Sequence, residues 1–344
     1  MKLKSLLLGS AAALFAVTGS QAADAVVVEA EPVEYVRVCD MYGAGYFFIP
    51  GTETCLRIGG RVRLEYEYQD SDPGAEGFEM RADMQLRANA INETDYGTLG
   101  SFVELQGGAL TTSQTGGANE NDDVFVNKAY LTLGSTTLGG DGFGLRAGYD
   151  DSFWARNNHY GFPTVFSGPY GFTNGVYLEA TYQMAGFSVT GGIEGNQRGG
   201  ALSDDEPRVY AGASYGNSFG YLAGHVLYDT DSEEVAYGVS AEINAIENLT
   251  IQGWYHVASD PGTVVVAGDE QWGIGASYGF GDWSVAGGYG QSDGAGAADL
   301  DHFATIQLGW SVAPGLSAQL AYLYTETDGG VETDRVRLRV TRSW

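Results

Sequence analysis

The final stretch of the chain, residues 334–344, alternates arginines with Val336, Leu338 and Val340 and ends on an aromatic residue. Successive side chains of a β-strand point to opposite faces, so this segment would carry cations on one face and hydrocarbon on the other. The same alternation recurs along the whole chain. A closed sheet with lipid outside and water inside satisfies both faces of such a pattern, whereas a soluble single layer does not. The sequence therefore predicts an all-β transmembrane barrel.

The alternation is clearest in two early segments. In residues 56–68, the apolar residues Ile58, Val62 and Leu64 alternate with charged ones, and residues 78–90 repeat the pattern. Both segments are at least as long as the roughly 9–11 residues of a tilted membrane strand. The pattern is weakest in residues 221–228. The sixteen candidate strands are residues 56–68, 78–90, 99–106, 125–133, 143–150, 176–184, 187–194, 208–215, 221–228, 234–244, 249–257, 271–278, 283–290, 302–310, 316–324 and 334–344.

The connections between these segments alternate in length. Residues 139–142, 185–186 and 280–282 are tight, whereas residues 107–123 form a long connection. Outer-membrane barrels place short turns in the periplasm and long loops outside. We therefore expect one up-and-down 16-stranded antiparallel barrel.

The N-terminus has the features of an export signal. Lys2 and Lys4 precede an apolar run over residues 6–17, and Ser20-Gln21-Ala22 forms a small-x-small cleavage site. No later stretch reaches the roughly 18 continuous apolar residues of a membrane helix. We expect a signal peptide over residues 1–22 and a single barrel domain over residues 23–344.

Charge and cysteine content narrow the possible roles. The formal net charge of −27 makes a nucleic-acid partner very unfavourable. Cys39 and Cys55 are the two cysteines, 16 positions apart, and the oxidising compartment implied by the signal favours a disulfide within an N-terminal segment, residues 23–55. The alternative, a metal pair, lacks further ligands because the four histidines are scattered. We expect no cofactor and no metal.

Residues 38–60 carry a family resemblance. Their sequence, Val-Cys-Asp-Met-Tyr-Gly-Ala-Gly-Tyr-Phe-Phe-Ile-Pro-Gly-Thr-Glu-Thr-Cys-Leu-Arg-Ile-Gly-Gly, closely resembles the N-terminal signature of the alphaproteobacterial porins of the Brucella and Rhizobiales type. The resemblance implies a trimeric general-diffusion porin in the Gram-negative outer membrane, in contact with its lipids. It also implies that a third external loop folds inward. The chain ends on Trp344, where such proteins more often end on Phe.

The arginines of the alternating segments should form one basic wall. In a closed barrel the last strand pairs with the first, so the polar faces of residues 56–68, 78–90 and 334–344 become neighbours. The alternative is the solvated face of a soluble sheet, with the arginines paired to nearby acids. The predicted wall consists of Arg57, Arg61, Arg63, Arg81, Arg87, Arg335, Arg337 and Arg339.

The long connection over residues 150–174 is rich in aromatic residues, among them Phe153, Trp154, Tyr160 and Phe162. Loops are usually polar and exposed, so this one should pack against something. By the resemblance it is the loop that narrows the pore; alternatively it caps the mouth or contacts a neighbouring subunit. Residues 162–171 carry no acid, so the acidic side of the constriction is assigned to Asp150, Asp151, Glu104 and Glu179.

The expected function is passive diffusion of small hydrophilic solutes and ions through a water-filled pore. A substrate-specific channel, for a sugar or another nutrient, is the alternative. An enzyme is disfavoured because His225 and His256 lack a nucleophile signature. Small outward residues of the early strands predict the trimer interface there, and larger aromatic ones predict that later strands face lipid. These two sets are Ala82, Ala88, Ala90 and Ala129, and Tyr237, Tyr255, Trp272 and Trp283.

Overall fold

The computed structural model describes residues 37–74, 76–113, 124–157, 161–166, 174–196, 207–230, 233–259, 269–293 and 300–344. The chain divides into two compact units, Met1–Arg37 and Val38–Trp344. The first unit, with the expected signal peptide, lies outside the described residues except for Arg37. All elements below belong to the second unit.

Strands make up nearly all of the regular structure. They are β1 Phe47–Phe48, β2 Cys55–Asp72, β3 Gly77–Thr94, β4 Gly97–Ser113, β5 Val124–Gly134, β6 Gly142–Asp151, β7 Asn174–Met184, β8 Phe187–Asn196, β9 Arg208–Asn217, β10 Gly220–Asp229, β11 Glu234–Ile246, β12 Leu249–Ala258, β13 Glu270–Phe280, β14 Trp283–Asp293, β15 Leu300–Ala313, β16 Leu316–Thr327 and β17 Glu332–Ser343.

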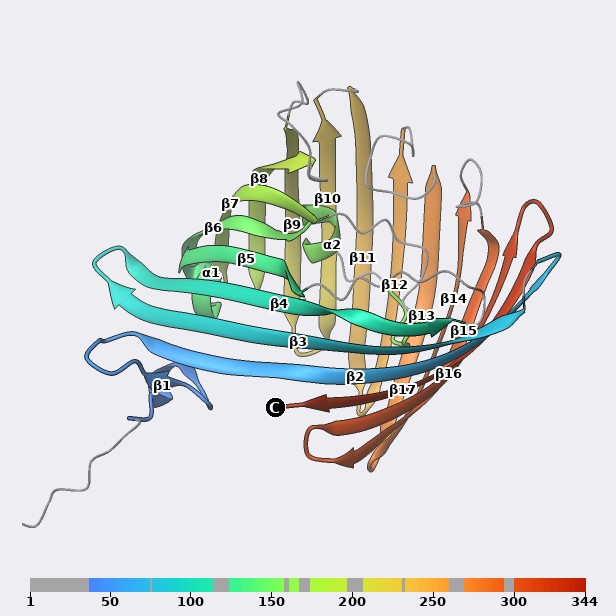
Figure 1. Cartoon of the computed structure of the whole chain (residues 1–344). Coiled ribbons are helices and arrows are strands. Elements are labelled where there is room, and N and C mark those ends of the chain that lie inside the picture. The colour runs from blue at the N-terminus through green and yellow to red at the C-terminus, as the bar shows by residue number, and fades with distance from the viewer. Residues whose placement is uncertain are drawn as a thin grey trace, which may run out of the picture. The chain divides into compact units, whose positions relative to one another are not determined.

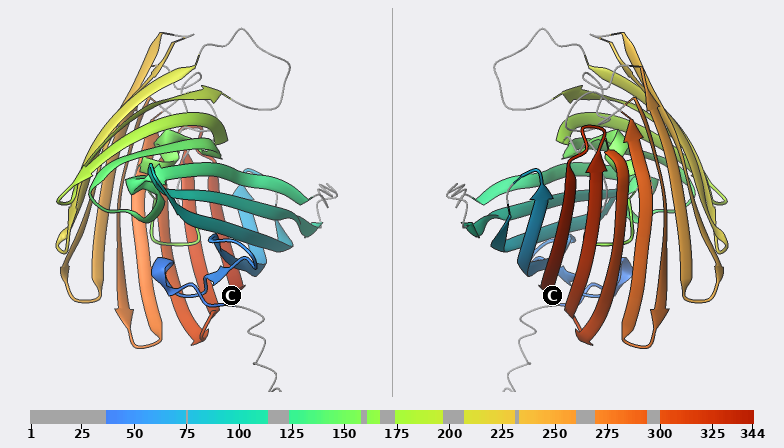
Figure 2. Two further views of the ribbon diagram at one scale, coloured as in Figure 1. Left: turned by 90° about the vertical axis from the view of Figure 1, so that its left-hand side faces the viewer. Right: turned by 90° about the vertical axis from the view of Figure 1, so that its right-hand side faces the viewer.

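Strands β2 to β17 form one closed antiparallel barrel. Each strand pairs with the next along the chain, and β17 pairs with β2 from Glu332↔Asp72 to Ser343↔Arg61. The two ends of the barrel sequence therefore lie side by side, as Figure 1 and the right-hand view of Figure 2 show. The short strand β1 pairs only with the start of β2. The predicted 16-stranded barrel is confirmed.

All sixteen predicted segments correspond to β2–β17, including the weakest, which lies within β10. The early strands are longer than the alternation indicated. Residues 99–106, for example, form only the middle of β4, which has 17 residues. Their Gly- and Thr-rich ends lack a hydrophobic period but still pair with β3, because a strand partner satisfies backbone groups whatever the side chain.

The two faces of the barrel wall have opposite character. Large apolar side chains such as Leu64, Ile306 and Leu338 are exposed on the outside, while charged side chains such as Glu65 and Glu104 are buried on the inside. A soluble protein shows the reverse arrangement. Near one rim, Trp283 and Trp310 stack with ring centroids 5.3 Å apart, the position that amphipathic rings favour at a membrane interface.

A helix that was not predicted precedes the tight connection over residues 139–142. Between β5 and β6 the chain forms α1 Ser135–Leu138 before Gly139 and Gly140. Three hydroxyls hold it: Ser135 Oγ donates to Gly142 O at 3.1 Å, Thr136 Oγ1 to Leu133 O at 2.9 Å and Thr137 Oγ1 to Thr98 O at 2.8 Å. Side chains that bond to the local backbone in this way favour turns over extended strand.

Helices are short throughout the described residues. Besides α1, they are η1 Asp40–Tyr42 and α2 Phe153–Asn157. In the part of the chain that the structure describes, no helix is long and apolar enough to cross a membrane.

The predicted disulfide is confirmed. Cys39 and Cys55 are bonded, with their Cα atoms 6.1 Å apart. Both are buried in a small cluster with Tyr46 and Ile91, so the segment with η1 and β1 packs onto the start of β2 and the end of β3. We call this segment, residues 38–54, the N-terminal cap.

The exposed apolar band generates a depth-dependent prediction. Ile306 lies outward in the middle of β15, and Val312 lies on the same face near the tight-turn rim. Ile306→Arg should lower the free energy of unfolding by about 2–4 kcal/mol and Val312→Arg by only about 0–1 kcal/mol, because a cation is costliest at the bilayer midplane. Guanidinium titration of vesicle-inserted protein, followed by tryptophan fluorescence, measures both. Equal losses would contradict an outward face in contact with lipid.

Candidate pore and its charged wall

The structure places the eight predicted arginines on the interior faces of three adjacent strands, β17, β2 and β3. All stand at odd-numbered positions, the same parity as the buried Glu65 and Asp83. The register sets Arg339 opposite Glu65 and Arg337 opposite Glu67 across the closing seam. Across the next pair of strands, Arg81 stands opposite Glu65. The eight arginines thus share the interior face of three neighbouring strands.

Carboxylates of the same strands neutralise much of this wall. Glu65 contacts both Arg81 and Arg339, and Arg63 Nε lies 3.7 Å from it. Asp83 lies 2.7 Å from Arg63. Glu67 contacts Arg337 and lies 3.9 Å from Arg335. We call these three carboxylates and their arginines the paired belt. Like charges packed this closely destabilise a fold unless opposite charges stand between them, and the belt supplies such charges.

These acidic partners are not among the pore residues predicted from sequence. Glu65, Glu67 and Asp83 are instead among the nearby acids of the soluble-sheet alternative. A signal was present, since all three have the same parity as the arginines in the alternating segments. Their pairing partners, however, follow from the register across strands.

The four acids assigned to the constriction lie on β4, β6 and β7, beside the basic wall around the ring. Glu104, only 1% exposed, accepts from Arg87 Nε and Asn127 Nδ2, both at 2.5 Å. Asp150 lies 2.8 Å from Lys128 Nζ and contacts Arg146, while Asp151 also contacts Lys128. Each acid therefore has a local cation, and Lys128 and Arg146 were not predicted from sequence.

Glu179 has its own cation on α2. Arg156 NH1 lies 3.0 Å from Glu179, and Tyr210 donates its hydroxyl to the same oxygen at 3.2 Å. Burial alone would lower the pKa of Arg156, but the adjacent Glu179 carboxylate outweighs it and raises that pKa. The guanidinium thus stays charged at working pH and ties α2 to β7.

The aromatic residues of α2 pack on the interior face of the later strands. The Phe153 ring stacks on Tyr210 of β9, with centroids 4.0 Å apart, and the Phe153 backbone N–H donates to Glu194 Oε2 at 2.7 Å. Trp154 meets His225 of β10 and His256 of β12 edge-on, at 4.4 and 4.9 Å between centroids. The two histidines set aside as catalytic candidates are therefore packing partners of α2.

Residues 161–166 continue along the interior wall. The Val165 N–H donates to Gln307 Oε1 of β15 at 2.7 Å, and the Val165 carbonyl accepts from Arg337 NH1 of β17 at 3.2 Å. The Arg337 guanidinium also lies 4.3 Å from the ring centre of Phe166. One peptide segment is thus held by two side chains of the wall.

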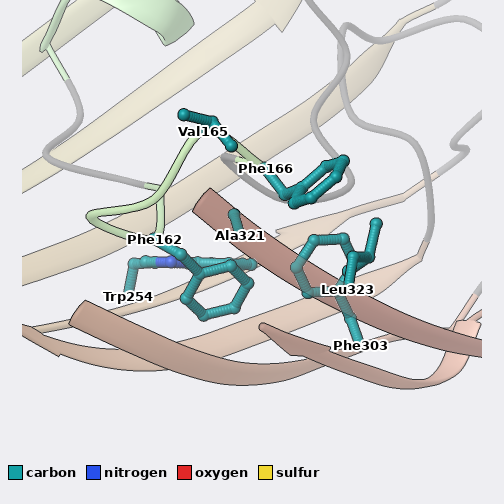
Figure 3. Packing of buried hydrophobic residues seen from close by; sticks show 7 residues of the cluster. All are labelled: Phe162, Val165, Phe166, Trp254, Phe303, Ala321 and Leu323. Atoms are coloured by element: carbon teal, nitrogen blue, oxygen red, sulfur yellow. The ribbon is translucent and has the colours of Figure 1, made fainter. Parts of the chain in front are cut away.

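A hydrophobic cluster supports the same segment (Figure 3). Phe162 stacks on Phe303 at 5.0 Å between centroids and packs near Trp254. Its buried members are Phe162, Val165, Phe166, Trp254, Phe303, Ala321 and Leu323. Of the predicted loop aromatics, Phe153, Trp154 and Phe162 are thus buried against the wall, and Tyr160 lies outside the described residues.

The charged groups show no metal-binding arrangement. Over the described ranges, three or more His, Cys, Asp or Glu side chains nowhere come together in a way that could hold a metal ion. The described interior presents cations, carboxylates and amides, a polar surface suited to contact with water and solutes.

Comparison with known proteins agrees with this geometry. The family model of the porin subfamily matches residues 24–337. Porin Omp2b of Brucella suis is 39% identical over 314 residues, covering 84% of this chain and 80% of the relative. Porin Omp2a of Brucella ovis is 37% identical over 319 residues, covering 84% and 85%.

Solved structures share the fold. A mutant of the Rh. blastica porin aligns with a TM-score of 0.58 at 16% identity, covering 83% of this chain and 99% of that one. OmpF of Salmonella typhi, solved as a complex with daunomycin, aligns with a TM-score of 0.66 at 13% identity, covering 85% and 98%. The profile match and the Brucella relatives agree with the closed 16-stranded barrel, and the chain belongs to the porin subfamily, a family of channel proteins in the outer membrane of Gram-negative bacteria.

Proposed function

We propose that the protein forms a water-filled channel for passive diffusion of small hydrophilic solutes and ions. The observation that carries this proposal is the inversion of the barrel faces, with exposed hydrocarbon outside and ionic side chains inside. Ionic groups in such numbers are stable beside water and costly in a dry core. Transport needs no bond to break; width and charge at the narrowest point decide which solutes pass.

We further propose that residues 150–174 are the third external loop and that they fold inward to form the constriction. The β6–β7 connection is a long one, and long connections lie outside in this class of barrel. Support comes from the contacts of α2 with β8, β9, β10 and β12, and of residues 161–166 with β12, β15 and β17. A loop that only capped the mouth would not need to reach side chains on so many strands.

The wall at this constriction carries mixed charge. The paired belt lies on β2, β3 and β17, and Arg337 both contacts Glu67 and holds Val165 of the loop. The acids Glu104, Asp150, Asp151 and Glu179 lie on the neighbouring strands with their own cations. Charges of both signs therefore lie side by side along the wall.

A sugar-specific channel receives less support. Rings that bind sugars by stacking must present a face to the solute, whereas Phe162, Trp254 and Phe303 are buried against one another.

The hold on Val165 can be tested with matched variants. Gln307→Ala removes the acceptor of a buried N–H, which should cost about 1–3 kcal/mol of loop docking, so the variant should show noisier single-channel currents and admit larger polyethylene glycols. Gln319→Ala serves as control, because Gln319 has the interior parity of β16 but forms no hydrogen bond with the loop residues that the structure describes. Planar-bilayer recording measures both. Identical traces for wild type and Gln307→Ala would contradict the constriction role.

We also propose a homotrimer that forms through the early strands. Leu64, Tyr66, Met80, Ala82, Leu338 and Val340 line an apolar hollow on the outer face of β17, β2 and β3. Contiguous exposed apolar surface with small residues suits close contact between subunits, while the other outer faces contact lipid.

The trimer interface is testable with one substitution at two sites. Ala82→Trp should lower the temperature at which trimers dissociate into monomers in detergent, because a bulky side chain keeps the subunits apart. Ala276→Trp places the same side chain on the outer face of β13, where lipid accommodates it, and should leave that temperature unchanged. Native electrophoresis after graded heating reads both. Dissociation of the Ala276→Trp variant alone would move the interface to the later strands.

A further inference from the structure

The basic wall divides into two parts with different charge balance. Toward the long connections, Arg81, Arg337 and Arg339 of the paired belt each contact Glu65 or Glu67. Toward the tight turns, Arg57 and Arg61 have the same interior parity on β2, but neither forms an ion pair with any residue that the structure describes. Carboxylates thus neutralise the arginines of the paired belt, where the loop docks. Arg57 and Arg61, nearer the tight turns, have no such partner among the described residues.

The surroundings of Arg61 show how scarce its counter-charge is. The charged groups that act on it are Arg63, Arg87, Asp83 and Glu104. Asp83 lies 2.7 Å from Arg63, and Glu104 accepts from Arg87 at 2.5 Å. Both carboxylates near Arg61 are therefore already engaged by other arginines.

The N-terminal cap presents an aromatic ring to Arg57. The Arg57 guanidinium lies 4.9 Å from the ring centre of Tyr46, whose hydroxyl accepts from Asn89 Nδ2 at 2.8 Å. At the rim beyond, Glu93 accepts from the Tyr42 hydroxyl at 3.2 Å and from the Thr98 hydroxyl at 2.9 Å. The Arg57 guanidinium thus rests on an aromatic ring, and the rim acid is engaged by hydroxyl donors.

The opposite end of the barrel has the opposite charge. Glu270, Asp293, Asp301 and Asp328 border one hollow near the long connections of β12–β17. A solute crossing from that end would pass the neutralised belt before it reaches Arg57 and Arg61. The net charge of −27 for the chain therefore does not describe the field at this depth.

We propose that Arg57 and Arg61 form an anion-binding step on the tight-turn side of the constriction, for small solutes that carry carboxylate or phosphate groups. Guanidinium binds the two oxygens of such groups in a planar fork and stays charged at working pH. The step raises the local concentration of permeating anions just beyond the narrowest point. The inference rests on the proposed channel function.

Citrate block of single channels in planar bilayers tests the step. Citrate, added in turn to each side of the full-length protein in potassium chloride, should interrupt the wild-type current more strongly from one side. Arg61→Gln should weaken the block about tenfold, because hydrogen bonds to a charged donor are lost. The double variant Arg57→Gln with Arg61→Gln should weaken it further. In a potassium chloride gradient, the reversal potential of both variants should shift toward cation selectivity.

Arg342→Gln is the charge-matched control. Arg342 is exposed on β17 near the same rim, and its NH1 donates to Pro314 O at 2.7 Å. Its loss removes one positive charge without altering the interior face, so citrate block should equal that of wild type. Equal block in wild type and Arg61→Gln, in channels that conduct, would overturn the anion-binding step alone. Absence of any conductance in the wild type would instead overturn the channel function.

Discussion

The hydrogen-bonded seam between β17 and β2 is the contact on which the rest of the structure depends. In hydrocarbon an unpaired backbone group costs several kcal/mol, so a membrane sheet must close on itself. The seam runs from Glu332↔Asp72 to Ser343↔Arg61 and joins segments about 270 residues apart. Closure also creates the charged wall, because Arg337 and Arg339 meet Glu67 and Glu65 only across this seam.

The interior shows how one surface can hold a loop and still conduct. Arg337 contacts Glu67, the Val165 carbonyl and the Phe166 ring at once. Pairing with Glu67 lowers the repulsion among neighbouring arginines, and the remaining donor fixes the loop. Breaking such a partly buried pair costs more than the pair itself contributes, since it leaves an uncompensated charge. The same residues therefore serve stability and, in the proposed constriction, pore width and local field.

Much of this architecture could be predicted from sequence because its main signal has a period of two. Alternation alone located all sixteen strands, and closure of the first strand on the last placed the arginines together. The disulfide followed from two cysteines in an exported chain. These inferences need only local patterns and one topological rule.

What could not be predicted depends on register and on contacts between distant residues. Glu65 lies between Arg81 and Arg339 because of pairings on both of its sides, and no local pattern specifies these. Lys128 and Arg146 stand alone on strands with weak alternation, so their pairing with Asp150 gave no signal. The packing of Trp154 on His225 and His256 joins residues about 70 to 100 positions apart.

The N-terminal cap bears on how the barrel avoids sticking to its neighbours. A sheet edge with unpaired N–H and C=O groups is a template for aggregation. β17 pairs with one edge of β2 from Asp72 to Arg61. Next along this edge, Trp344 forms backbone hydrogen bonds with Gly60, and β1 pairs with Leu56 and Cys55. The bond between Cys39 and Cys55 tethers β1 to the strand that it shields. The leading segment thus works as an edge guard for the part of β2 that the last strand does not cover.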